Sequence, residues 1–119
     1  MAVTLTTPQV HGAGWAVNAI TADASGCEVV KAAPGSGYYL VIKHLTLICD
    51  ANITVTIGEG ESSSAVETAI VGPIPFASNG PEMDLVFNPP IQLTENKALT
   101  VDASGAGNIV LFVQGEVHP

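Results

Sequence analysis

Short runs in which apolar and polar residues alternate fill most of the chain, and turn-forming residues separate them. Residues 53–57 (ITVTI) place three β-branched apolar side chains on one side and two threonines on the other. Residues 82–88 (EMDLVFN) and 97–102 repeat this period of two. We find no helical period. About eight short strands, with turns at roughly 8–12-residue spacing, predict an all-β antiparallel sandwich.

The longest run, residues 38–49 (YYLVIKHLTLIC), changes phase in its middle. Its apolar side chains fall on even positions up to Ile42 and on odd positions from Leu45 onward. A β-bulge near Lys43-His44 would bring both halves to one face, and such a bend is common where a strand passes toward the other sheet of a sandwich. Through a turn at residues 50–52, this run is predicted to form a hairpin with residues 53–57.

Glycine and proline mark the remaining boundaries. Residues 58–64 (GEGESSS) are predicted to form a polar loop and residues 67–71 a strand. Residues 72–76 (GPIPF) are expected to be extended but not a central strand, because proline lacks the backbone N–H that a sheet requires. Pro89-Pro90 is expected to end the strand before it.

The N-terminal segment leaves two interpretations open. Residues 2–7 read as a strand, and residues 9–20 contain Trp15, Val17 and Ile20 as candidate anchors. This segment is either an arm that docks on a neighbouring molecule or an ordinary first strand of its own sheet. We therefore divide the 119 residues into an arm or first strand, 1–20, and a sandwich, 21–119, within one domain.

The last strand, residues 108–117 (NIVLFVQGEV), is apolar on both faces. Ile109, Leu111 and Val113 point one way, and Val110 and Phe112 point the other way. One face can join the core of a sandwich, but the other face also needs a cover. We expect that cover to be a sister subunit or, failing that, the N-terminal arm.

Composition gives a second indication of assembly and argues against several classes of binding partner. Apolar residues make up 47% of the chain and charged residues only 12%, which suggests that much of the surface is covered by other molecules. Arginine is absent, there are three lysines and the net charge is −8, so binding to nucleic acid or to an anionic membrane is not expected. No signal peptide or 18-residue apolar span is recognised, which favours folding in a cytoplasm and free thiols at Cys27 and Cys49.

Candidate chemistry is sparse. The chain has no nucleophile elbow, phosphate-binding loop or zinc-protease motif. Its histidines lie far apart, at positions 11, 44 and 118. Asp50, Glu59 and Glu61 could offer oxygens to Ca²⁺, but they lack the alternating spacing of a dedicated calcium loop and read better as solvated acids. We therefore expect no catalytic residue, cofactor or metal, and a protein that is not an enzyme.

Residues 37–117, about two thirds of the chain, carry a resemblance to a known family. Its features are the long strand continuing into DANITVTIGEG, then a Gly-Pro-Ile-Pro motif followed by Ala-x-Asn-Gly, then SGAGNIVLFVQGEV. In these features the chain resembles small jelly-roll proteins of tailed-bacteriophage virions. The resemblance implies a tumour necrosis factor-like jelly roll that forms a homotrimer. It also implies a structural role as a capsid decoration, or cement, protein on the outer surface of the head.

From this we expect a virion protein that is made in the host cytoplasm and binds the major capsid protein as a trimer. Val110 and Phe112, together with Tyr38 and Tyr39, are the predicted subunit-interface residues. The predicted capsid contact is the N-terminal stretch Ala2, Val3, Thr4, Leu5, Thr6, Thr7, Pro8 and Gln9. The alternative is a carbohydrate- or receptor-binding tip domain of a phage fibre or tail, which predicts exposed aromatic side chains beside acids in the loops.

Overall fold

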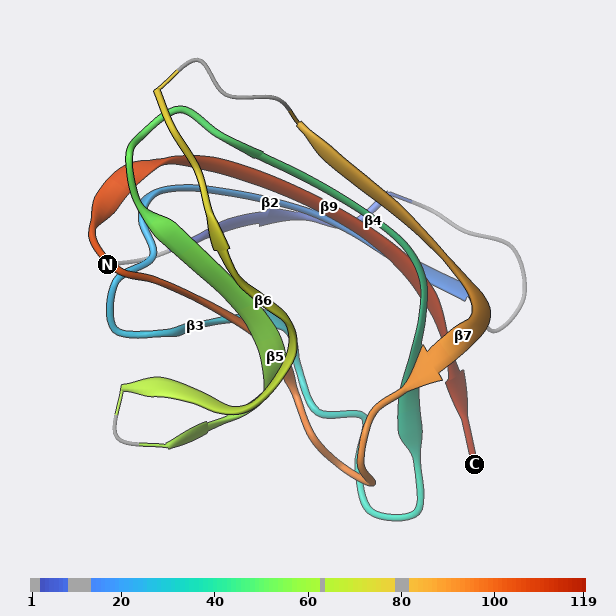
Figure 1. The fold of residues 1–119 in the computed structure, drawn as a ribbon. Coiled ribbons are helices and arrows are strands. Elements are labelled where there is room, and N and C mark those ends of the chain that lie inside the picture. The colour runs from blue at the N-terminus through green and yellow to red at the C-terminus, as the bar shows by residue number, and fades with distance from the viewer. Residues whose placement is uncertain (1–2, 9–13, 63, 79–81) are drawn as a thin grey trace.

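The protein is a sandwich of two antiparallel β-sheets, as the alternation of apolar residues predicts (Figure 1). The computed structural model describes residues 3–8, 14–62, 64–78 and 82–119. Within them lie nine strands and no helix. The strands are β1 (Thr4–Thr6), β2 (Gly14–Asp23), β3 (Glu28–Lys31), β4 (Tyr39–Cys49), β5 (Thr54–Ser62), β6 (Ala65–Pro75), β7 (Met83–Gln92), β8 (Leu99–Ala103) and β9 (Ala106–His118).

The strands divide into a five-stranded sheet and a four-stranded sheet. The first has the order β1-β2-β9-β4-β7 and the second the order β3-β8-β5-β6. From β2 onward the chain changes sheet at every connection except the β5–β6 hairpin, which is the connectivity of a jelly roll. In Figure 1 the five-stranded sheet arches over the other, and the end of β5 and the start of β6 project away at the lower left.

The core lies between the sheets and is built from the residues that alternation places inward. Leu40, Ile42, Leu45 and Leu47 of β4 are all at most 1% exposed. The pairing of β4 with both of its neighbours shifts between Ile42 and His44, which confirms the predicted bulge. The bulge restores the inward phase, but it does not redirect β4 toward the other sheet. The strand remains between β9 and β7 on both sides of it.

The predicted hairpin between residues 38–49 and 53–57 is wrong. β4 and β5 belong to opposite sheets, so the turn between them is a crossover. Asp50 helps to direct it: one carboxylate oxygen accepts from the backbone N–H of Asn108 at 3.0 Å and the other from its side-chain amide at 2.8 Å. These bonds tie the end of β4 to the start of β9, and the chain then crosses to the second sheet.

Two predicted breaks are also absent. β5 continues through residues 58–62 instead of forming a loop, because glycine lets β6 cross it closely: a Cβ on Gly58 would collide with the carbonyl of Thr68. β7 continues past Pro89-Pro90 to Gln92. Its residues 87–90 bulge outward opposite Lys43, which an edge strand tolerates because one side of it has no ladder to maintain.

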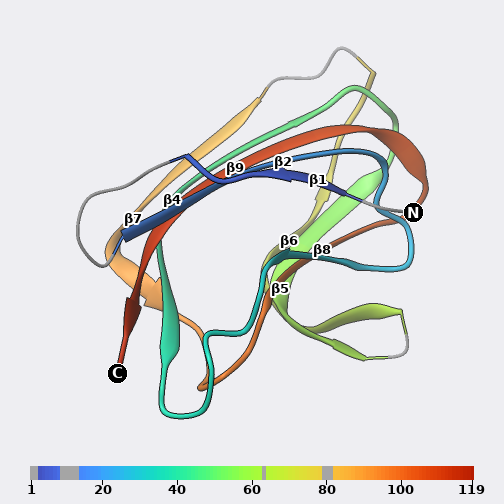
Figure 2. The same ribbon diagram turned by 180° about the vertical axis from the view of Figure 1, so that it is seen from behind.

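The N-terminal segment folds back on its own sheet. β1 pairs with β2 at the sheet edge, as Figure 2 shows from behind, and β2 pairs along its length with β9. Residues 14–23 therefore form an ordinary strand of the sheet, which is the second of the two interpretations. β2 also continues past residue 20, where we predicted the N-terminal segment to end. Trp15 and Val17 enter the core as expected, but Ile20 does not anchor the segment, since it is 47% exposed on the opposite face.

Gly115 is expected to be intolerant of any side chain. A Cβ at this position would collide with the carbonyl oxygen of Val41 and with the Trp15 ring, and neither can move without disturbing the sheet. Gly115→Ala should lower the free energy of unfolding by roughly 1–3 kcal/mol, the usual cost of overpacking. Gly105→Ala is the matched control, because its Cβ would lie 3.5 Å from Ile53, an ordinary contact. Thermal unfolding of both variants measures this, and equal melting temperatures would contradict the packing described.

Candidate functional site

The outer face of the five-stranded sheet carries an exposed group of apolar side chains. In β9, Ile109, Leu111 and Val113 are buried in the core, whereas Val110 and Phe112 point outward and are half-buried. Val110 pairs directly with Ile20 on one side and with Ile48 on the other. Directly paired residues of an antiparallel ladder have adjacent side chains on one face. We call Ile20, Ile48, Val110 and Phe112 the apolar patch.

The patch has no cover from the nearest described strand. Ile20 is 47% and Ile48 is 40% exposed, which is high for large apolar side chains in strands of a sheet. β1 could have crossed over this face, but it lies beside β2 as the edge strand of the same sheet. β1 therefore extends the sheet and leaves its outer face open.

Charges on the same face are few and paired. Phe112, Thr46 and Asp84 lie side by side on three neighbouring strands. Asp84 accepts a hydrogen bond from the Thr46 hydroxyl at 2.9 Å and contacts the His44 ring, and both contacts hold its pKa below the ordinary value. Further along β9, Glu116 contacts His118 at 2.8 Å and Lys43 at 3.0 Å, and its pKa is lowered by these two partners. Asp84 and Glu116 thus each have a basic partner, although the chain as a whole carries a net charge of −8.

The hydrogen bond from Thr46 to Asp84 has an effect on the pKa of Asp84 that can be measured. Thr46→Ala removes the first-ranked cause of the shift, so the pKa of Asp84 should rise toward its ordinary value of 3.8. A lowered pKa means that this carboxylate stabilises the fold above its unfolded-state pKa, and that the contribution is lost as the pH falls through the folded-state pKa. NMR titration of the Asp84 side chain, in the original protein and in Thr46→Ala, measures this rise in pKa. Asp50 is the internal control. Its pKa is lowered by hydrogen bonds from Asn108, so it should not change in Thr46→Ala.

The predicted interface residues separate into two groups. Val110 and Phe112 lie in the patch. Tyr39 lies near the opposite end of the sheet, half-buried and paired with His118, and Tyr38 is 46% exposed just before β4. At about 3.3 Å per residue, Tyr39 is some 30 Å along β4 from Ile48. The structure therefore does not bring the tyrosines to the patch.

The predicted capsid-contact residues form the edge of the same sheet. Thr4, Leu5 and Thr6 make up β1 and are exposed, as are Thr7 and Pro8 after it, whereas Val3 is half-buried against the core. Ala2 and Gln9 lie outside the described residues.

Two members of the patch, Ile20 and Ile48, are not among the predicted interface residues. A signal for each was present. Once the bulge sets Leu45, Leu47 and Cys49 inward, Ile48 must point outward. Trp15 and Val17 fix an odd inward phase for β2, which turns Ile20 outward.

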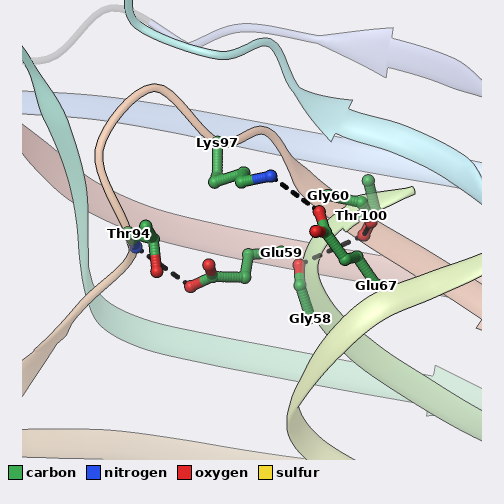
Figure 3. A network of polar contacts seen from close by, with 7 residues as sticks. All are labelled: Gly58, Glu59, Gly60, Glu67, Thr94, Lys97 and Thr100. Carbon is green, nitrogen blue, oxygen red and sulfur yellow. Dashed lines mark hydrogen bonds and ion pairs between the residues drawn. The ribbon is translucent and has the colours of Figure 1, made fainter. Parts of the chain in front are cut away.

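A second polar network lies on the four-stranded sheet (Figure 3). Glu59 is 8% exposed and accepts from the backbone N–H of Thr94 at 3.0 Å. Lys97 binds Glu67 at 2.7 Å, and the Thr100 hydroxyl lies 3.3 and 2.8 Å from the carbonyls of Gly58 and Gly60. These contacts hold β5 and β6 to β8 and to the segment before it, so their evident role is structural.

Most of the side chains considered for metal binding bind other residues. Asp50 binds Asn108 and Glu59 binds Thr94, while His44 and His118 contact acids on the other sheet. His11 lies outside the described residues. In the part of the chain that the structure describes, no three His, Cys, Asp or Glu side chains gather as a metal site would require.

The cysteines are buried and free, as expected. Cys27 and Cys49 form no disulfide, and burial raises the pKa of the Cys27 thiol to about 11, so it is not a reactive thiolate at neutral pH. Over the described ranges, we find no helix long and apolar enough to cross a membrane. Comparison of the chain with protein-family models, with curated proteins and with solved structures gave no match.

Proposed function

We propose that this chain is a structural virion protein, a capsid decoration protein that works as a homotrimer on the outer surface of a phage head. The observation that carries the proposal is the apolar patch on the outer face of the five-stranded sheet. Apolar residues at the centre and few charges are the composition typical of the core of a protein–protein interface. A decoration protein that works as a trimer needs such a surface to hold its own subunits together.

Charge favours a second copy of the chain as the molecule that covers the patch. Two copies with a net charge of −8 repel one another, so they can meet closely only where unpaired acids are missing. Two acids of the outer face meet this condition, because Asp84 and Glu116 are each paired with a basic side chain.

The assignment to a capsid comes from the resemblance of residues 37–117 to small phage jelly-roll proteins. The mechanism is mechanical: trimers bridge neighbouring capsomers and add buried interface that opposes the internal pressure of packaged DNA. The major capsid protein is the partner, and the exposed edge strand β1 is the surface of each subunit that we assign to it.

Two measurements test this function. Analytical ultracentrifugation of the purified chain should give a trimer at micromolar concentration. Added to expanded phage heads that lack decoration, the trimer should cosediment with them and raise their resistance to heat. A monomer would contradict the assembly, and a trimer that ignores the heads would contradict the decoration role.

One observation supports the alternative, a carbohydrate- or receptor-binding tip domain. Tyr38 is 46% exposed, and the adjacent Gly37 donates its N–H to the Glu95 carboxylate at 2.7 Å. An exposed aromatic ring beside an acid is an arrangement that can bind a sugar. Saturable binding on a glycan array that Tyr38→Ala abolishes would favour this role over decoration.

A further inference from the structure

The first half of the edge strand β7 is attached to its sheet by few contacts. Residues 83–86 pair with residues 44–47 of β4, and β7 has no second neighbour in the sheet. Beyond them the pairing is interrupted where residues 87–90 bulge outward. The core-facing Met83 and Leu85 are only half-buried, unlike the fully buried residues of the central strands. Such a segment should open locally at a lower free energy than the centre of the sheet.

Asp84 makes the side-chain hydrogen bonds of this segment. Its Oδ1 atom accepts from the Thr46 hydroxyl at 2.9 Å and contacts Nε2 of His44 at 2.5 Å. In the part of the chain that the structure describes, β7 has no other side-chain hydrogen bond. Both partners lie on β4, so the two contacts join the strands across the outer face of the sheet.

The two contacts respond differently to pH. The Thr46 hydroxyl does not titrate in the neutral range, whereas an imidazole ordinarily exchanges its proton between about pH 5 and 8. Asp84 stays ionised over this range, because the bonds from Thr46 and His44 hold its pKa below the ordinary value. With a protonated imidazole, the His44 contact is a charge-assisted hydrogen bond, which is stronger than the neutral one left after deprotonation. The contact is therefore strongest below the titration of the imidazole and above that of the carboxylate.

No other charge in the paired strands faces this contact. Val86 of β7 and Gln114 of β9 lie on either side of His44, and neither side chain is charged. The nearest charged residues along the chain are Lys43, which binds an acid of β9, and the exposed Glu82 before β7. Among the described residues, protonation of His44 thus changes the one ion pair that joins β7 to β4.

We infer that the contact between His44 and Asp84 is a proton-dependent attachment of the β7 edge, so that residues 83–86 open less readily in mild acid than at neutral pH. Opening exposes unpaired backbone of β4 together with the half-buried Met83 and Leu85. An exposed edge with apolar side chains is prone to pair with other chains, so the attachment protects the protein most in mild acid. Both residues belong to one chain, and the inference therefore does not rest on the proposed function.

Amide hydrogen exchange followed by NMR tests the inference. Exchange rates at about pH 5.5 and 7.5 are divided by the intrinsic rates to give opening constants for the protected amides of residues 83–86. In the original protein these constants should be about two- to fivefold lower at the acidic pH, the range for an exposed ion pair. His44→Gln and Asp84→Asn should each remove the difference. The amides of the central strand β9 are the internal reference and should not show it.

Thr46→Ala is the matched control, because it removes the bond that does not titrate and leaves the ion pair. It should raise the opening constants at both pH values and keep the difference between them. Equal constants at the two pH values in the original protein would overturn the inference, and so would a difference that persists in His44→Gln. A difference that changes with protein concentration would belong to a contact between copies and would also overturn it.

A second measurement asks whether the contact forms in solution. Because His44 contributes to the lowered pKa of Asp84, His44→Gln should raise that pKa toward its ordinary value of 3.8 in an NMR titration. Circular dichroism should show an unchanged fold, since both side chains are partly exposed. An unchanged pKa in a folded variant would mean that the contact is absent and would overturn the inference.

Discussion

Phe112→Asp is expected to convert the proposed trimer into a folded monomer. Within one chain Phe112 is only half-buried, between Asn18 and Thr46, so a carboxylate there can be hydrated. In the assembled interface the same carboxylate would be buried without a partner, and the aromatic contact would be lost. Central aromatic residues of interfaces commonly contribute about 2 kcal/mol or more, and an unpaired buried charge adds to the loss. Sedimentation velocity should show the monomer, and circular dichroism an unchanged fold.

A matched variant shows whether the effect belongs to the patch. Val29 is also an outward-facing apolar strand residue, and at 41% exposed it is more accessible than the half-buried Phe112, but it lies in β3 of the other sheet. Val29→Asp should leave the trimer intact. If Phe112→Asp also leaves it intact, the patch is not the subunit interface.

Leu111→Ala should lower the free energy of unfolding by about 2–5 kcal/mol, the range for a large-to-small change in a packed core. Leu111 is fully buried and pairs with Ala19 on one side and Leu47 on the other, so the lost side chain leaves a cavity that its neighbours in the sheet cannot readily fill. Denaturant unfolding of the variant measures the change.

Val110→Ala is the control for this experiment, because it changes the next residue of the same strand on the opposite face. Val110 is half-buried, so its truncation should destabilise an isolated subunit much less than Leu111→Ala. Both variants are measured in the Phe112→Asp background, so that subunit association does not contribute to the free energy of unfolding. A Val110→Ala effect as large as that of Leu111→Ala would mean that both faces of β9 are core.

Local alternation was sufficient to predict what depends on a single strand. The two faces of β9, the inward side of β7 and the bulge in β4 all follow from which neighbouring residues are apolar, because side chains in a strand point alternately to its two faces. The same logic gave Val110 and Phe112 as outward residues. The class of fold follows from the number and spacing of such runs.

Long-range pairing could not be predicted in this way. The turn at residues 50–52 has the length and composition of a hairpin turn, and only the placement of β4 and β5 in opposite sheets shows that it is a crossover. Residues 58–62 look like a polar loop until β6 is seen to pass closely over Gly58. The patch is a product of registers between β2, β9 and β4, so Ile20 and Ile48 could join Val110 only once those registers were known.

The position of β9 has a consequence for biosynthesis. This strand, residues 106–118, lies between β2 and β4 in the middle of the five-stranded sheet. During synthesis, β2 and β4 leave the ribosome before β9, the strand that lies between them, has been made. The larger sheet therefore cannot form during most of translation. Such non-local pairing slows folding and exposes apolar edges meanwhile. We therefore expect the native fold, and with it any assembly, to form after translation has passed β9, and nascent chains arrested before residue 106 to depend on chaperones.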